Sequence, residues 1–273
     1  NPKILLEDKS IDLSYITTNI SLKSFINNQF SIDDLKILTK EIQIKDLISL
    51  TRAVKASPQL FVLDNITKAG LISANINLTF DLDGKIKNDY QINGTIKKAK
   101  FNIFNQAEID NLNLSFDISK NQLTLRKIET DFNSIKLKSH LIKIEERKNI
   151  FFIDGEIIND QQNFDINKLK PVLGNLLNNV EIDKIDFSSI NTFSFNVNKK
   201  LKLNNLKIET NLNLENFQIV KNPINLKPFL TNYTEQVKFE DHKIKIKFNK
   251  DIFDIKGEGG IYIGDKLDQL SYN

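Results

Sequence analysis

The sequence holds two histidines and no cysteine, so it offers no thiol as a nucleophile or metal ligand and only two imidazoles. His140 lies in the stretch LKSHLIKIEE, and His242 lies in the stretch EDHK. Covalent catalysis and zinc binding both require several such groups close together, whereas these two are isolated in the sequence. We therefore interpret His140 as a solvated residue on the polar side of a strand and His242 as a solvated turn residue.

Paired carboxylates and glycine-rich stretches are the other patterns that could do chemistry. Asp33-Asp34 and Glu145-Glu146 could exchange protons with a substrate, but both pairs fall at polar strand ends. DLDGK at 81–85 lacks the later ligands of a calcium loop, and GEGGIYIG at 257–264 is not followed by a phosphate-binding helix. We interpret the first as a hairpin turn and the second as glycines that permit strand curvature or close approach. We expect no enzyme activity, no cofactor and no metal site.

The charge balance argues against a nucleic-acid partner. The 273 residues carry 38 Lys and Arg against 35 Asp and Glu, and the two signs are interspersed, so no broad basic field exists. Lys97, Lys98 and Lys100 form a small basic group that could meet lipid phosphates, although we favour a solvated strand edge. No apolar run approaches the ~20 residues of a membrane span. Because the sequence starts at Asn1 and holds no Met, we expect it to be a piece of a longer chain.

Alternation of apolar and polar residues dominates the sequence. In LISANINLTFDLDG (71–84), every even position from Ile72 to Leu82 is apolar, and the odd positions between them are polar. A period of two is typical of a strand with one apolar and one polar face. The pattern recurs along the chain and predicts an antiparallel meander. Its hairpin turns are expected at Asp83-Gly84, Lys120-Asn121, Lys199-Lys200 and Lys250-Asp251.

A degenerate repeat runs through these strands, since residues 114–133 match residues 193–213 and share the letters KIET. Repeated hairpins suggest an architecture that grows along one dimension, and chance similarity among strands is the alternative. In two places we predict a break between strands. The four strands concerned are Lys85–Ala99, Lys100–Phe104, Gln236–Glu240 and Lys243–Asn249.

Helical signals are few. Asp46 is predicted to cap the helix LISLTRAVKAS, and Ser57-Pro58 is predicted to open a second helix that Gly70 ends. A third, short or kinked helix is expected near 165–179, because that stretch carries a proline and a glycine. The stretch 222–233 is expected to be a loop or a single turn between two prolines.

A sheet with one apolar face must cover that face with another layer. About sixteen strands of ~20 Å at ~4.8 Å spacing present an apolar face on the order of 1,500 Å², and three short helices cover roughly 500 Å² of it. Either the sheet packs on itself as a sandwich or barrel, or it curls into an open trough whose lining contacts acyl chains. The great length of the meander and the absence of Trp, Cys and Met as core anchors favour the trough.

We therefore predict a mainly β fold, in which a long, antiparallel, strongly curved sheet forms an open hydrophobic groove with two or three short helices. The lipid-binding side chains that line the groove are expected to be Ile72, Ile76, Leu78, Phe80, Leu82, Ile92, Phe101, Ile103, Leu112, Leu114, Phe116, Ile118, Leu123, Leu125, Phe151, Ile153, Phe193, Phe195, Val197, Ile244, Ile246 and Phe248.

The stretch from Glu41 to Ile158 resembles the central region of YhdP-type proteins in the AsmA-like superfamily, which also contains TamB. Glycines stand at the matching places, namely Gly70, Gly94 and Gly155. The matching segments follow one another in the order EIQIKDL, LDNITKAGLISANINLTFDLDG, YQINGTIKKAKFNI, IDNLNLSFDISKNQLTLRKIETDFNSIKLKS and FFIDGEI.

This resemblance implies a bridge-like lipid transfer role, in which phospholipid acyl chains lie on the apolar lining between the inner and outer membranes. It implies a β-groove segment at 1–160 with helices near 46–69, and a continuation at 161–273 after the helix near 165–179. The implied partners are phospholipids, and the two membranes through parts of the parent chain outside this fragment. The implied location is the periplasm of a Gram-negative bacterium, with the parent chain anchored in the inner membrane. The alternative is a β-sandwich or β-solenoid module of a surface or adhesion protein that acts by protein contacts.

Overall fold

The structure is a computed structural model that describes residues 2–6, 9–27, 29–54, 58–103, 107–165, 181–200, 202–221, 237–263 and 266–273. Within these residues the chain forms fifteen strands and three short helices. The strands belong to one antiparallel sheet, so the predicted mainly β, antiparallel fold with few helices is confirmed.

Several strands exceed twelve residues and are longer than the ~3–10 residues usual in globular proteins. Those of the first half are β1 (Lys3–Leu6), β2 (Lys9–Ile20), β3 (Ile32–Thr39), β4 (Ile42–Gln43), β5 (Thr67–Thr79), β6 (Gln91–Ile103), β7 (Ala107–Ser119) and β8 (Gln122–Phe132). Those of the second half are β9 (Ile135–Arg147), β10 (Ile150–Phe164), β11 (Glu181–Asn198), β12 (Leu203–Lys221), β13 (Val237–Asn249), β14 (Ile252–Ile263) and β15 (Lys266–Tyr272).

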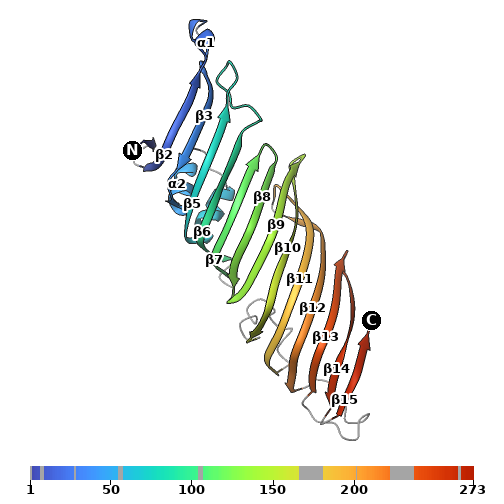
Figure 1. The fold of residues 1–273 in the computed structure, drawn as a ribbon. Helices are drawn as coiled ribbons and strands as arrows, with labels where there is room; N and C mark the ends of the chain where they lie inside the picture. The colour runs from blue at the N-terminus through green and yellow to red at the C-terminus, as the bar shows by residue number, and fades with distance from the viewer. Residues whose placement is uncertain are drawn as a thin grey trace. The chain divides into compact units, whose positions relative to one another are not determined.

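Strands that follow one another in the chain are also neighbours in the sheet, apart from β4, which pairs with β5 beside the main path (Figure 1). The chain leaves the sheet between β3 and β5, where β4 and two helices intervene. Antiparallel neighbours need only short turns, so this strand order is the meander that the sequence predicts.

Two compact units divide the chain. Unit 1 comprises residues 1–130 and 140–148, and unit 2 comprises residues 131–139 and 149–273. The three helices, α1 (Leu22–Ile26), α2 (Ile44–Val54) and α3 (Pro58–Ile66), all belong to unit 1. The described residues of unit 2 form strands and turns and include no helix.

The two predicted helices between 46 and 69 are present with shifted ends. α2 begins at Ile44, two residues before the predicted cap Asp46, because Ile44 and Ile48 together face the sheet and are both buried. α3 begins at Pro58 as predicted, but it ends at Ile66. The hydroxyl of the buried Thr67 donates to the carbonyl oxygen of Leu63 at 2.6 Å and completes the last turn.

Gly70, the predicted end of the second helix, lies instead within β5. A Cβ atom at this position would lie 2.8 Å from Cα of Ala99 and 2.7 Å from the Ile44 side chain, so glycine permits close packing of α2 and β6 on β5. Helix α1 was not expected from the sequence. Residues 166–179 of the predicted third helix lie outside the described residues, and so does the predicted loop at 222–233.

The two predicted breaks between strands are wrong, because β6 and β13 each run through the predicted gap. One residue in each strand, Lys98 (φ 48°) and Asp241 (φ 51°), adopts the left-handed conformation where the register to the next strand shifts. Asn111 in β7 and Asn205 in β12 do the same. Each is a β-bulge that adds one residue, so the apolar side chains on both sides of it stay on one face.

Three of the four predicted hairpin turns connect strands directly, at Lys120-Asn121, Lys199-Lys200 and Lys250-Asp251. The fourth turn, at Asp83-Gly84, exists, since the Gly84 amide donates to the Asp81 carbonyl oxygen at 3.0 Å. It sits within a longer connection at 80–90, and the flanking strands end earlier and begin later than predicted.

The core of unit 1 lies where α2 covers the sheet (Figure 1). Ile44 and Ile48 of α2 form one buried cluster with Ala99 of β6. A second cluster joins Ile11 and Leu13 of β2 to Ile37 of β3, and Leu47 of α2 packs against it. The helix therefore closes one part of the apolar face with protein atoms.

The turn between β13 and β14 offers a test of the backbone assignment. Lys250 and Asp251 have φ of 50° and 63°, a pairing that favours glycine at the second position. We expect Asp251→Gly to raise the free energy of unfolding by about 0.5–1 kcal/mol, because glycine relieves the left-handed strain. Asp254→Gly, the same substitution inside β14, is expected to lower it by about 1 kcal/mol. Urea denaturation measures both, and a loss of stability in Asp251→Gly contradicts the assigned turn.

Candidate functional site

The predicted lining residues of unit 1 meet across neighbouring strands. Ile76 pairs with Ile92, which pairs with Ile118, and Ile72 pairs with Ile96. Such directly opposed pairs point to the same face. Most of the other predicted lining residues of unit 1 pack into the apolar clusters around Ala99 and around Phe116, and Leu78 and Ile103 pair with apolar residues of the next strand. Phe80 and Leu82 are exceptions, because they lie in the connection at 80–90 and not in a strand.

Part of this face is filled by the protein itself. Leu114 and Phe116 are buried and form a cluster with Ile128 of β8. The Phe116 ring lies over Gly94, where an added Cβ would come within 2.7 Å of the ring. Phe101 and other half-buried residues pack against the cluster that Ile44 and Ile48 of α2 form with Ala99. Leu114 and Phe116 are thus core residues, and the rest of the predicted lining on these strands is half-buried.

The apolar face of unit 2 is built differently. Phe193 of β11 pairs with Ile208 of β12, which pairs with Phe248 of β13, and Phe248 pairs with Phe253 of β14. The outermost of these, Phe253, is 67% exposed. Among the apolar residues of unit 2 whose side chains are described, only Ile135 and Val237 are buried, and the others are half-buried or exposed. The described part of this unit therefore keeps a broad apolar face with little protein against it.

The predicted lining residues of unit 2 share this face. Phe151 pairs with Val197, and Ile153 pairs with Phe195. All four side chains are half-buried. Ile244 and Ile246 continue the face on β13, in register with residues of β12. The sequence interpretation missed their partners, which the alternation in each hairpin pointed to. These are Ile208, Leu212, Phe253 and Ile255.

A polar stripe that the sequence interpretation also missed crosses this face. Asn191 lies between Ile157 and Thr210 in register, and its amide donates to the Ile157 carbonyl oxygen at 3.1 Å and to Ser189 Oγ at 3.0 Å. Thr210 in turn donates to Asn191 Oδ1 at 2.9 Å. The break in the pattern at SSINT (188–192) is its signal in the sequence. Satisfied polar groups of this kind fix strand register within an apolar surface.

His242 is a correction, because it is neither solvated nor in a turn. It lies within β13 and is 2% exposed, since the bulge at Asp241 turns its side chain onto the apolar face. Its Nε2 lies 2.9 Å from the Gly260 carbonyl oxygen, and the Tyr272 hydroxyl lies 3.5 Å from Nδ1. Burial raises the pKa of the Tyr272 phenol. His140, in contrast, is exposed in β9 as expected.

The glycines of GEGGIYIG permit close approach, as predicted. A Cβ atom on Gly257 would lie 2.5 Å from the Tyr272 ring, and one on Gly259 would lie 2.4 Å from the His242 ring. The His242 and Tyr272 rings stack with centroids 6.1 Å apart. Aromatic side chains laid over glycine thus anchor β14 and β15 to β13.

The predicted basic group of unit 1 is largely neutralised. Lys97 pairs with Glu41, and Lys100 pairs with Glu108 and with Asp110, whose Oδ2 lies 3.3 Å away. The hydrogen bond to Glu108 raises the pKa of Lys100. Lys98 forms the bulge of β6. Lys97 and Lys98 are exposed as expected, but β6 pairs with both β5 and β7, so the predicted strand edge is wrong.

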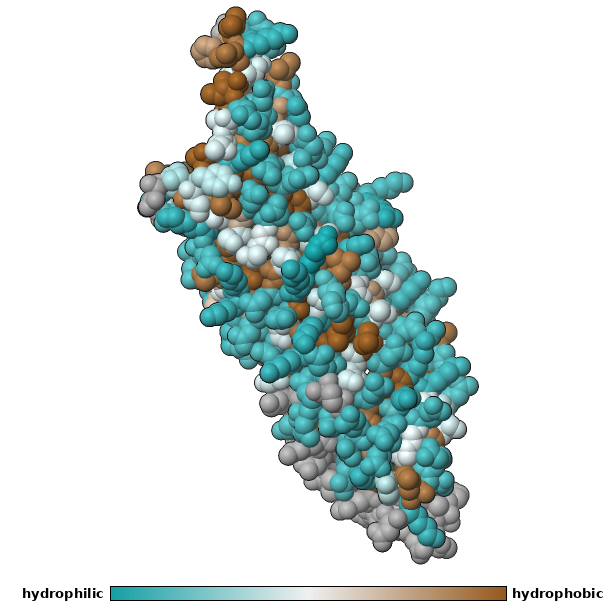
Figure 2. All heavy atoms as spheres, viewed as in Figure 1, coloured by the Kyte–Doolittle hydropathy of each residue, from teal (hydrophilic) through white to brown (hydrophobic). Residues whose placement is uncertain are grey.

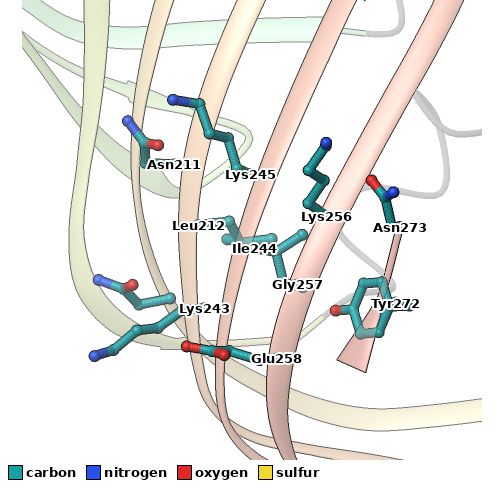
Figure 3. A pocket seen from close by; sticks show the side chains of 11 residues that line it. Asn211, Leu212, Lys243, Ile244, Lys245, Lys256, Gly257, Glu258, Tyr272 and Asn273 are labelled. Atoms are coloured by element: carbon teal, nitrogen blue, oxygen red, sulfur yellow. The ribbon is translucent and has the colours of Figure 1, made fainter. Parts of the chain in front are cut away.

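Two shallow depressions mark the strands of unit 2, with volumes of ≈ 410 Å³ and ≈ 400 Å³. Figure 3 shows that side chains around the larger one come from β12 to β15 and are mostly polar, including Lys243, Lys245 and Lys256. Because strand side chains alternate, these lysines belong to the face opposite Ile244. On that face Lys245 contacts Glu209 at 2.7 Å, and this hydrogen bond lowers the pKa of Glu209. The larger depression therefore lies mostly among polar residues, whereas the smaller one is lined by Phe193, Ile208 and Phe248 together with their polar neighbours on the same strands.

Comparisons with models of protein families, with curated proteins and with solved structures found no match. In the described ranges, no three histidine, aspartate or glutamate residues come close enough to hold a metal ion. No helix in the part of the chain described here has the length and apolarity to cross a membrane.

The polar stripe can be tested through its central residue. Asn191→Ala removes the group that satisfies Ser189, Thr210 and the Ile157 carbonyl, so we expect the free energy of unfolding to fall by about 1–3 kcal/mol. Asn196→Ala, on the opposite face of the same strand, is the matched control and is expected to change it by less than about 0.5 kcal/mol. Urea denaturation measures both, and equal effects contradict a structural role for the stripe.

Proposed function

We propose that the apolar face of this sheet binds the acyl chains of phospholipids. The observation that carries the proposal is the row Phe193, Ile208, Phe248 and Phe253, which crosses four strands of unit 2 and ends on a side chain that is 67% exposed. An exposed, contiguous apolar surface on a polar chain marks a binding surface for an apolar partner. The polar face of the same strands, with Glu209 paired to Lys245, suits contact with water.

The energetics of such a face favour capture with easy movement. Burial of apolar groups is worth ~0.8 kcal/mol per methylene, so ten methylenes that each lose half of their exposed surface contribute about 4 kcal/mol. The contacts are spread along rows of similar side chains, and none of them forms a deep pocket. A chain that slides from one row to the next exchanges like contacts for like contacts, which keeps the barrier to movement low.

The resemblance to the AsmA-like superfamily supplies a setting for this activity. We propose that the chain is a segment of a periplasm-spanning protein that conducts phospholipids between the inner and outer membranes, with its parent chain anchored in the inner membrane. In this role the side chains act by contact alone, and we propose no catalytic group and no cofactor. The long meander of two-faced strands in each unit supports this reading.

Paired variants on opposite faces of one strand test the proposal. We expect Phe193→Asp and Phe248→Asp to lower the phospholipid that co-purifies with the chain by about tenfold, because a charge on the lining repels acyl chains. The next residue in the chain after each of these points to the opposite, polar face. Ser194→Asp and Asn249→Asp add the same charge there and are expected to keep the bound phospholipid. Native mass spectrometry and lipid extraction measure bound lipid.

Circular dichroism of each variant confirms that the strands remain folded. A wild-type chain that carries no lipid and binds no fluorescent fatty acid contradicts the proposal. A compact, lipid-free monomer that binds another protein supports the surface or adhesion module instead. Equal losses in both members of each pair show that unfolding, and not the lining, removed the lipid.

A further inference from the structure

Two hairpins of unit 2 end in turns that carry lysine. The turn between β11 and β12 holds Lys199, Lys200 and Lys202, and the turn between β13 and β14 holds Lys250 and Asp251. All four lysines are exposed. Within the described part of the chain, none of the four side chains forms an ion pair. The basic end is defined here as these four lysines.

Both turns lie at the same end of their strands. β11 and β12 meet at the first turn, and β13 runs antiparallel to β12, with Asn249 in register with Lys207, so that β13 finishes on the same side. Figure 2 shows mostly hydrophilic residues along the upper right margin of the view, where the upper ends of these strands lie in Figure 1. The lysines of the two turns therefore stand along one edge of the sheet.

The backbone of the first turn is fixed by Asn198. Its Oδ1 accepts the amide of Lys200 at 2.9 Å and the amide of Lys202 at 3.1 Å. The Asn198 amide donates in turn to the Lys202 carbonyl oxygen at 3.2 Å. These bonds hold the backbone while the lysine side chains stay in water. An anion that binds them therefore orders side chains but not backbone.

The charges between the apolar row and the turns favour an anion. The apolar row is Phe193, Ile208, Phe248 and Phe253. Beyond it, on the side of the two turns, the described residues of β10 to β14 carry five lysines and two aspartates. They are Lys199, Lys200, Lys202, Lys207, Lys250, Asp154 and Asp251. Asp154 points to the polar face, because the next residue, Gly155, pairs with Phe193 of the lining.

The nearest other carboxylates do not reverse this balance. Glu209 lies one row further in, on the polar face, where Lys245 contacts it at 2.7 Å and Lys247 at 3.8 Å. In the hairpin before β10, the glutamates at 145 and 146 are matched by Arg147 and Lys148. The basic end therefore keeps an excess of positive charge.

Each turn closes just beyond an opposed apolar pair of the lining. Val197 pairs with Leu203 before the first turn, and Phe248 pairs with Phe253 before the second. Leu203 is 48% exposed. A phospholipid has the same order of parts, since its apolar chains are joined through glycerol to a phosphate. Lysine suits the phosphate, because it carries a point charge on a long, flexible stem.

We propose that the basic end binds the phosphate groups of phospholipids whose acyl chains lie on the apolar face of unit 2. This inference rests on the proposed function and deepens it, because it gives the bound lipid a direction, with the phosphate at the turns and the chains along the strands. Exposed ion pairs are individually weak and are screened by salt. The basic end therefore selects and orients the lipid without trapping it.

Two soluble lipids with the same fluorescent short acyl chains test the proposal. Phosphatidylglycerol carries a phosphate and diacylglycerol does not, and each is used below the concentration at which it aggregates, so that no bilayer is present. Fluorescence anisotropy is expected to show that the wild type binds phosphatidylglycerol about tenfold more tightly at low salt. The preference is expected to disappear at ~1 M salt, where the screening length is ~3 Å. A preference that survives this salt overturns the proposal.

A charge-matched pair of variants locates the site. Replacing the four lysines of the basic end by glutamine is expected to remove the preference and to keep the affinity for diacylglycerol. The control removes four charges elsewhere in unit 2 and is expected to keep the preference. It consists of Lys238→Gln, Lys243→Gln, Lys256→Gln and Lys266→Gln. Equal loss in both variants shows an effect of net charge and overturns the proposal.

Inorganic phosphate separates a lipid headgroup from a free anion. It makes no contact with the apolar face, so we expect it to compete at least about a hundredfold more weakly than phosphatidylglycerol. Competition as strong as that of the lipid shows an anion site independent of the acyl chains and overturns the proposal.

The same lipids distinguish this proposal from the proposed function. Phe193→Asp is expected to lose both lipids, whereas the variant of the basic end loses only the preference. A wild type that binds both lipids equally at low salt overturns phosphate binding and leaves acyl-chain binding intact. A wild type that binds neither lipid contradicts the proposed function itself.

Discussion

The structure depends on one constraint: every strand between β1 and β15 in the sheet order pairs its backbone with two neighbours, while its side chains divide between an apolar and a polar face. Hydrogen bonds between neighbouring strands satisfy the backbone N–H and C=O groups, but they leave the apolar face to be covered by something else. The face stays continuous only if every irregularity preserves the side on which apolar residues emerge. The bulges at Lys98, Asn111, Asn205 and Asp241 do this, because each inserts one residue where the alternation shifts by one.

The two units meet this constraint differently. In unit 1, α2 lays Ile44 and Ile48 on the sheet, and Phe116 packs over Gly94, so much of the face is covered by protein. In the described part of unit 2 no helix lies on the strands, and polar groups at Asn191 and His242 hold the register within the apolar surface. The cost of a buried polar group is offset there because each one is hydrogen-bonded. The described part of unit 2 thus combines a fixed backbone with an apolar face that no described helix covers.

The row from Phe193 to Phe253 is broad and lies along the sheet, so it suits flexible chains that contact it over a long path.

The sequence alone determined the fold class, the meander and most of the apolar face, because alternation with period two is a local property that each strand carries by itself. It also placed α2 and α3 within a few residues of their bounds. Only the tertiary structure decided that the shifts of alternation near Lys98 and Asp241 are bulges. A bulge and a turn leave the same local pattern in the sequence, and they differ only in whether the residues on both sides pair with the same neighbouring strand. It likewise decided that His242 is buried and that Phe116 belongs to the core, because burial depends on which residues the neighbouring strands bring alongside.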